Sequence, residues 1–119
     1  MTVQQCYAAF GGDYDDASRR LMKDERIAKY LRMYLNDDSY SLLLSSVAAC
    51  DWETAFRAAH TMKGNSLNLA LSPITRYSIA VTEALRPGHA PADRGLFDAD
   101  LAALGDAYRT VTDTIRLLD

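Results

Sequence analysis

Apolar side chains recur at every third or fourth position through most of the sequence, and this spacing constrains the fold more than any other feature. It is the period of an α-helix, whereas a half-buried strand alternates at every second residue. The clearest run has spacings that alternate between four and three, a seam typical of helix bundles. It consists of Phe97, Leu101, Leu104, Tyr108, Val111, Ile115 and Leu118.

Similar stripes predict the other helices. The expected helical segments are two short ones over residues 3–10 and 14–21, followed by 24–35, 40–48, 52–69, 72–85 and 97–118. Asp13 and Asp51 are the expected N-caps of the second and fifth segments. Ser72 is expected to cap the sixth with its hydroxyl, because Pro73 then occupies the first helical position. The segment 86–95, with two prolines and two glycines, is the expected loop.

Amphipathic helices with short connections bury their stripes together by packing as a bundle. We therefore expect an all-α fold, an antiparallel four-helix bundle with the short N-terminal helices lying across one end. The 119 residues are enough for one core, and no composition shift or repeat divides them. A single domain over residues 1–119 is the expected organisation.

Charge and composition argue against several classes of function. The chain has 13 basic and 16 acidic residues, and its one adjacent basic pair, Arg19-Arg20, is surrounded by carboxylates. Binding to nucleic acid is therefore disfavoured. No apolar run is long enough for a membrane span, no secretory signal begins the sequence, and two cysteines define no disulfide framework. We expect a cytoplasmic monomer without membrane contact. His89 has no second ligand at metal-binding spacing, so no metal site is expected.

One position in the segment that begins at Trp52 suggests chemistry. On a helical wheel, His60 lies at the border between an apolar and a polar sector, so that its ring is reachable from solvent. The apolar sector contains Trp52, Ala55, Phe56, Ala59 and Met62, and the polar sector contains Thr54, Thr61, Asn65 and Asn68. A histidine at such a border either takes part in a reaction or only packs against the core. The residues around it decide between these two interpretations.

Lys63 and Gly64 favour the chemical interpretation of His60. A mid-helix glycine costs about 1 kcal/mol relative to alanine, so an advantage should offset it. Side chains on a helix lean toward its N-terminus, and a bulky residue at position 64 would cover His60. Lys63 can bring a positive charge to the same space, although its stem can also simply cover apolar surface. A neutral imidazole near a cation is a competent nucleophile for phosphoryl transfer. The sequence does not indicate which ring nitrogen reacts.

The segment from Ala59 to Asn68, AHTMKGNSLN, resembles the core motif of histidine phosphotransfer (HPt) domains, in which a histidine is followed three and four residues later by lysine and glycine. The similarity extends to the early Gly-Gly-Asp-Tyr and to the segment from Asp51 to Phe56. One position differs, because Ala70 stands where many members of the family have a second glycine. This difference is expected to affect helix packing or the turn before Ser72, and it leaves the fit to a partner open.

The resemblance implies a phosphoryl carrier without a nucleotide site or kinase activity of its own. His60 would accept phosphate from the aspartate of a response-regulator receiver domain and pass it reversibly to another receiver. Lys63 would neutralise the phosphate, and Gly64 would leave access to the ring. The partners would be receiver domains, a hybrid sensor histidine kinase, or both. No cofactor is expected here, since any magnesium would belong to the receiver.

A receiver has to touch the outer face around His60, where we expect Arg57, Thr61, Asn65 and Leu67 to contact the partner. Leu67 and Leu71 form either an apolar docking patch or a contact with a neighbouring helix. An alternative function is a non-catalytic helical adaptor that docks a receiver or kinase without carrying phosphate. A hydrolase or kinase is disfavoured, because paired carboxylates, a nucleotide loop and a base beside the histidine are all missing from the pattern.

Overall fold

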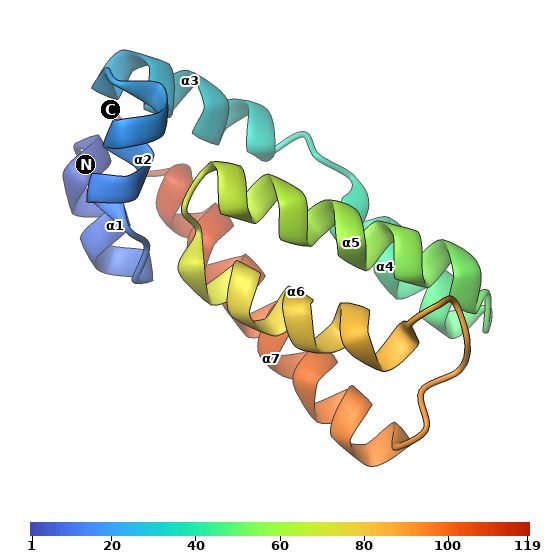
Figure 1. Cartoon of the computed structure of the whole chain (residues 1–119). Helices are drawn as coiled ribbons and strands as arrows, with labels where there is room; N and C mark the ends of the chain where they lie inside the picture. The colour runs from blue at the N-terminus through green and yellow to red at the C-terminus, as the bar shows by residue number, and fades with distance from the viewer.

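The structure, a computed structural model, describes residues 1–119 and contains seven α-helices and no strand. The expected all-α fold is confirmed (Figure 1). The helices are α1 (Val3–Phe10), α2 (Tyr14–Leu21), α3 (Asp24–Tyr34), α4 (Ser39–Ala48), α5 (Trp52–Asn68), α6 (Ser72–Leu85) and α7 (Arg94–Ile115).

The long helices form a bundle in which α5 packs against both α4 and α6, and α6 packs against α7. Each of these helices contributes fully buried side chains to the core, among them Leu43 of α4, Met62 of α5, Ile74 of α6 and Leu104 of α7. The three N-terminal helices gather at one end of the bundle, as Figure 1 shows. None of the seven helices combines the length and the apolar character that a membrane span requires.

The N-terminal helices are attached to the turn between α5 and α6 by two hydrogen bonds. The Tyr7 hydroxyl donates to the Leu69 carbonyl oxygen at 2.7 Å, and the Asp13 N–H donates to the Ala70 carbonyl oxygen at 3.1 Å. Gly12 permits this approach, because a Cβ atom there would lie 2.9 Å from the Ala70 oxygen. The end of the helix that contains His60 is therefore fixed to α1 and α2.

Carboxylates cap three helices. Asp13 accepts from the Asp16 N–H at the start of α2, and Asp51 accepts from the Thr54 N–H at the start of α5, so both expected N-caps are confirmed. Asp93 does the same for α7, which therefore begins at Arg94. The expected loop over 86–95 was too long, because its last two residues belong to the first turn of α7.

The expected hydroxyl cap of α6 was wrong. Ser72 is already the first residue of the helix, Pro73 follows it within the first turn, and no side chain caps the backbone. The buried Leu71 occupies the N-cap position instead, and its carbonyl oxygen accepts the first helical hydrogen bond from the Thr75 N–H at 3.1 Å. The helix start is thus fixed by burial of Leu71 rather than by a polar cap.

Three helices end at residues with positive φ that are not glycine, and the first of these residues is Met22 after α2, with φ 72°. Cys50 after α4 has φ 55°, and Ala70 after α5 has φ 54°. In the latter two turns the next N–H bonds back to a carbonyl five residues earlier, from Asp51 to Ser46 and from Leu71 to Ser66, each at 2.9 Å. This left-handed ending usually contains glycine. Ala70 thus lies in the turn before Ser72 and adopts this left-handed conformation without a glycine.

The side-chain ion pairs all lie within single helices. Seven pairs join residues three or four apart on exposed helix faces, and none joins two helices. Exposed pairs of this kind each contribute well under about 1 kcal/mol. Apolar packing and a few hydrogen bonds therefore hold the helices together.

Candidate functional site

His60 lies in the middle of α5, and its side chain is exposed to solvent. The residues that face inward on the same helix include the fully buried Ala55, Ala59 and Met62, while Trp52 and Phe56 are half-buried. Ala58 and Ser66 are buried as well, because α5 is contacted by α4 on one side and α6 on the other. The border position predicted for the histidine is confirmed.

The imidazole of His60 rests against one aromatic ring and makes no hydrogen bond to the protein. Its centroid lies 6.3 Å from that of Phe56, one turn earlier, with 26° between the two ring planes. The guanidinium of Arg86 lies 5.3 Å from the Phe56 centroid and is held by Glu83 at 3.0 Å. This stack supports one side of the imidazole and leaves its nitrogens unpaired.

Gly64 leaves open space one turn after His60. A Cβ atom built on this glycine would meet no atom within 4 Å outside the local helix backbone. No neighbouring helix therefore approaches this point, and close helix packing does not explain the residue. The space is free for a group attached to His60.

Lys63 contributes a positive charge that no carboxylate of the chain neutralises. Its side chain is half-buried and takes part in no ion pair. Residues three apart on a helix have Cβ atoms about 5–6 Å apart, so the ammonium can reach a group carried by His60. By contrast, the nearby Arg57 is paired with Glu53 at 3.7 Å.

The expected partner-facing residues divide into two groups. Arg57, Thr61 and Leu67 are exposed, as a docking role requires, although the Thr61 hydroxyl donates to the Arg57 carbonyl oxygen at 3.0 Å. Asn65 is half-buried, and its amide donates to the Asp37 carboxylate at 2.9 Å. Leu71 is fully buried, so of the two interpretations it packs inside the protein.

Two residues near the site were missed by the sequence analysis. Phe56 was assigned to the core, yet its position four residues before His60 places the two rings on one face. Asp37 precedes α4 and bridges it to α5, since its carboxylate accepts from the Ser39 N–H and from Asn65, both at 2.9 Å. No sequence signal connects Asp37 to a partner so far along the chain.

The helix that contains His60 begins at a charged cap residue, Asp51. Hydrogen bonds from Thr54, first its hydroxyl and then its N–H, hold the pKa of Asp51 below its usual value. The cap is therefore charged at neutral pH, and a negative charge at this position stabilises the N-terminus of α5.

No group of three or more histidine, cysteine or acidic side chains is placed to hold a metal ion, and His89 lies exposed in the loop before α7.

Comparison with known families agrees with this arrangement. Residues 26–115 match the family model described as the Hpt domain. The chain belongs to the Hpt domain family. Hpt domains are phosphocarrier modules rather than kinases, and they act with receiver domains and kinases in two-component phosphorelays. No curated protein and no solved structure matches the chain with significance.

The matched segment of this Hpt domain extends from α3 to the end of α7 and contains His60, Lys63 and Gly64. Helices α1 and α2 precede it. The bundle and the exposed histidine helix therefore lie within the matched segment, and α1 and α2 lie outside it.

Proposed function

We propose that this Hpt domain accepts a phosphoryl group on His60 from the aspartyl-phosphate of a receiver domain and passes it to a second receiver. In the forward step, the imidazole nitrogen that carries no hydrogen attacks phosphorus and forms an N–P bond. The P–O bond to the aspartate breaks, and its electron pair leaves with the carboxylate. The reverse sequence on another receiver regenerates the free imidazole.

The open space beside an exposed imidazole is the observation that carries this proposal. Phosphoryl transfer asks a protein mainly to position groups and to offset charge. Phe56 supports the ring, Gly64 leaves room for the phosphoryl group and the partner, and the unpaired Lys63 offsets the negative charge. Any magnesium that the transfer needs would be held by the receiver.

A transfer assay tests the proposal directly. The protein is mixed with a phosphorylated receiver domain and magnesium, and its intact mass is followed. We expect a gain of one phosphoryl group in the wild type and in His89→Gln, and none in His60→Gln. His89→Gln is the matched control, because the chain has only two histidines and both are exposed.

Two results would contradict the proposal. If His60→Gln accepts as much phosphate as the wild type, the acceptor is a different residue. If the wild type binds a receiver but accepts no phosphate, and binding survives His60→Ala, the protein is an adaptor rather than a carrier.

A further inference from the structure

Basic residues are concentrated in one short segment of the chain. Six of the 13 basic residues fall within residues 19–32, which contain only two acidic residues. This segment therefore has a formal charge of +4, whereas the rest of the chain, with seven basic and fourteen acidic residues, has a charge of −7. It covers the end of α2 and most of α3, at the end of the bundle where the N-terminal helices gather (Figure 1).

Three cations of this segment are not neutralised by a carboxylate. They are exposed to solvent and take part in none of the ion pairs of the chain. These three residues are Lys23, Arg26 and Lys29. By contrast, most arginines outside the segment are paired with an acidic residue three or four positions away.

The carboxylates near the three free cations are mostly engaged elsewhere. Two arginines of α2 share Asp16, at 3.1 and 3.5 Å. The Tyr14 hydroxyl donates to Asp24 at 2.6 Å. Glu25 is exposed and makes no ion pair, so it subtracts one charge from the cluster. An excess of positive charge therefore remains at the surface of α3.

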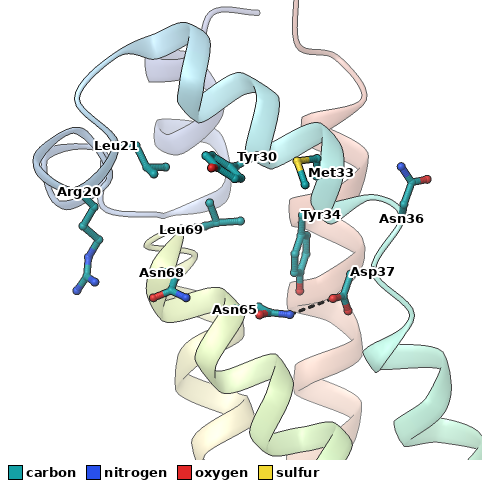
Figure 2. Close-up of a pocket in the computed structure, with 10 residues that line it drawn as sticks. All are labelled: Arg20, Leu21, Tyr30, Met33, Tyr34, Asn36, Asp37, Asn65, Asn68 and Leu69. Carbon is teal, nitrogen blue, oxygen red and sulfur yellow. Dashed lines mark hydrogen bonds between the residues drawn. The ribbon is translucent and has the colours of Figure 1, made fainter.

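Two exposed methionines stand at the ends of this row of cations. Met22, which follows α2, is 77% exposed, and Met33, in the last turn of α3, is 54% exposed (Figure 2). Arg26, Lys29 and Met33 are spaced by three and four residues and share one face of the helix. Ile27, on the other side of α3, is fully buried. We call the exposed surface the α3 basic face, and it consists of Met22, Lys23, Arg26, Lys29 and Met33.

The composition of the α3 basic face favours a lipid surface over other acidic partners. Lysine is depleted at the centre of protein interfaces. Contacts with the phosphates of nucleic acid do not use exposed methionines. Clusters of four to eight basic residues on an amphipathic helix are typical of anionic-lipid binding, in which apolar side chains enter the boundary between headgroups and acyl chains.

We propose that the α3 basic face binds the surface of an anionic bilayer. Lys23, Arg26 and Lys29 contact lipid phosphates, and Met22 and Met33 enter the headgroup boundary. The acidic remainder of the chain is repelled by the same surface, so the protein approaches with this face first. The sequence analysis expected no membrane contact because no apolar run is long enough for a span, but a peripheral contact needs no span.

This inference goes beyond the proposed function and does not depend on it. His60 lies on α5 and is not part of the α3 basic face. Binding to lipid can therefore be measured without a receiver and without phosphate.

Vesicle co-sedimentation tests the proposal. The protein is mixed with vesicles of phosphatidylglycerol and phosphatidylcholine, or with vesicles of phosphatidylcholine alone. We expect binding to the anionic vesicles only, and release at about 0.5 M salt, because the Debye length is then only a few ångströms.

A pair of charge variants separates this face from net charge. Arg26→Gln/Lys29→Gln should weaken binding to the anionic vesicles by roughly 25-fold, since each basic residue near such a surface contributes about five-fold in affinity. The matched control is Arg94→Gln/Arg109→Gln, which removes the same charge from two exposed positions on α7 and should bind as the wild type does. Thermal unfolding of both variants checks that the fold is retained.

A methionine variant tests the apolar part of the contact. Met22→Asn should weaken binding to the anionic vesicles by about three-fold or more, because the methionine no longer enters the headgroup boundary. Asparagine tolerates the positive φ of this position, 72°. Binding of Met22→Asn with the affinity of the wild type would show that Met22 stays in water.

Several outcomes overturn the proposal. The α3 basic face is not a lipid site if the wild type binds neither type of vesicle, binds both equally, or loses as much affinity in Arg94→Gln/Arg109→Gln as in Arg26→Gln/Lys29→Gln. Binding to duplex DNA in the absence of vesicle binding assigns the face to nucleic acid. If Arg26→Gln/Lys29→Gln binds vesicles as the wild type does but slows phosphoryl transfer, the face serves a protein partner.

Discussion

Replacing Gly64 by alanine should make the protein more stable. A glycine inside a helix is less favourable than alanine by about 0.8–1 kcal/mol. Position 64 lies well inside α5, and an added Cβ meets no atom within 4 Å, so no steric term offsets this gain. We expect the free energy of unfolding to rise by about 1 kcal/mol, which corresponds to an increase in Tm of roughly 3–6 °C for a chain of this size.

The same position should show an opposite effect on transfer. A side chain at position 64 leans toward the preceding turn, which carries His60. Gly64→Gln should therefore keep the added stability but slow phosphoryl transfer by roughly ten- to hundred-fold, because the phosphoryl group and the receiver need that space. Gly64→Ala should lie between Gly64→Gln and the wild type in transfer rate.

Thermal unfolding and a transfer time course on the same samples check both effects. The matched control is Ala102→Gly, the reverse change at an exposed position in the middle of α7, which should lower the free energy of unfolding by a similar amount. A lower Tm for Gly64→Ala would show that the glycine serves packing. A wild-type transfer rate for Gly64→Gln would refute the access argument.

Three further changes test the helix ends. Gly12→Ala should lower the free energy of unfolding by about 1–3 kcal/mol in a denaturant titration, because its Cβ would lie 2.9 Å from the Ala70 carbonyl oxygen. Cys50→Gly should raise it by about 0.5–1 kcal/mol in the same assay, since glycine relieves the positive φ and position 50 is exposed. Asp51→Ala should lower Tm above about pH 4, and this difference should shrink progressively as the pH falls further. The pKa of Asp51 is lowered in the fold, so its stabilising effect is present above the unfolded pKa and is lost as pH falls through the folded one.

The helices and the position of His60 follow from local rules that the sequence displays. The period of three and four residues reports which face of each helix is buried, and the carboxylates of Asp13 and Asp51 mark helix starts at fixed offsets. His60 could be placed at the border of α5 because burial follows the wheel. The functional role assigned to it stays a prediction until phosphate transfer is measured.

The features that sequence analysis missed depend on contacts between distant segments. Cys50 and Ala70 adopt the left-handed conformation that normally indicates glycine, because the surrounding turn hydrogen bonds outweigh a local cost of about 1–2 kcal/mol each. Leu71 looked like a continuation of the histidine face, but α5 ends at Asn68, and the turn at Ala70 directs Leu71 into the core.

Sequence analysis also did not predict the groove between α3 and the C-terminal part of α5, which Tyr30, Met33 and Leu69 line (Figure 2). Its walls come from α2, α3 and α5, and no periodicity indicates where three such segments meet. Asn65 shows the same difficulty. It was expected on the partner-facing surface, and its bond to Asp37 depends on a residue 28 positions earlier in the chain.

The ion pairs between side chains lie within single helices, and the one pair between distant segments joins the N-terminal amine to Asp119, so this protein is suited to experiments that vary ionic strength. Added salt screens exposed charges, yet the bundle would lose only weak exposed pairs, of which the pair at the two chain ends alone connects distant segments. The architecture should therefore persist from dilute buffer to about 1 M salt, while an encounter guided by Lys63 and its neighbours would weaken. A salt series can thus measure how much long-range electrostatic attraction speeds the encounter with a partner while the fold stays intact.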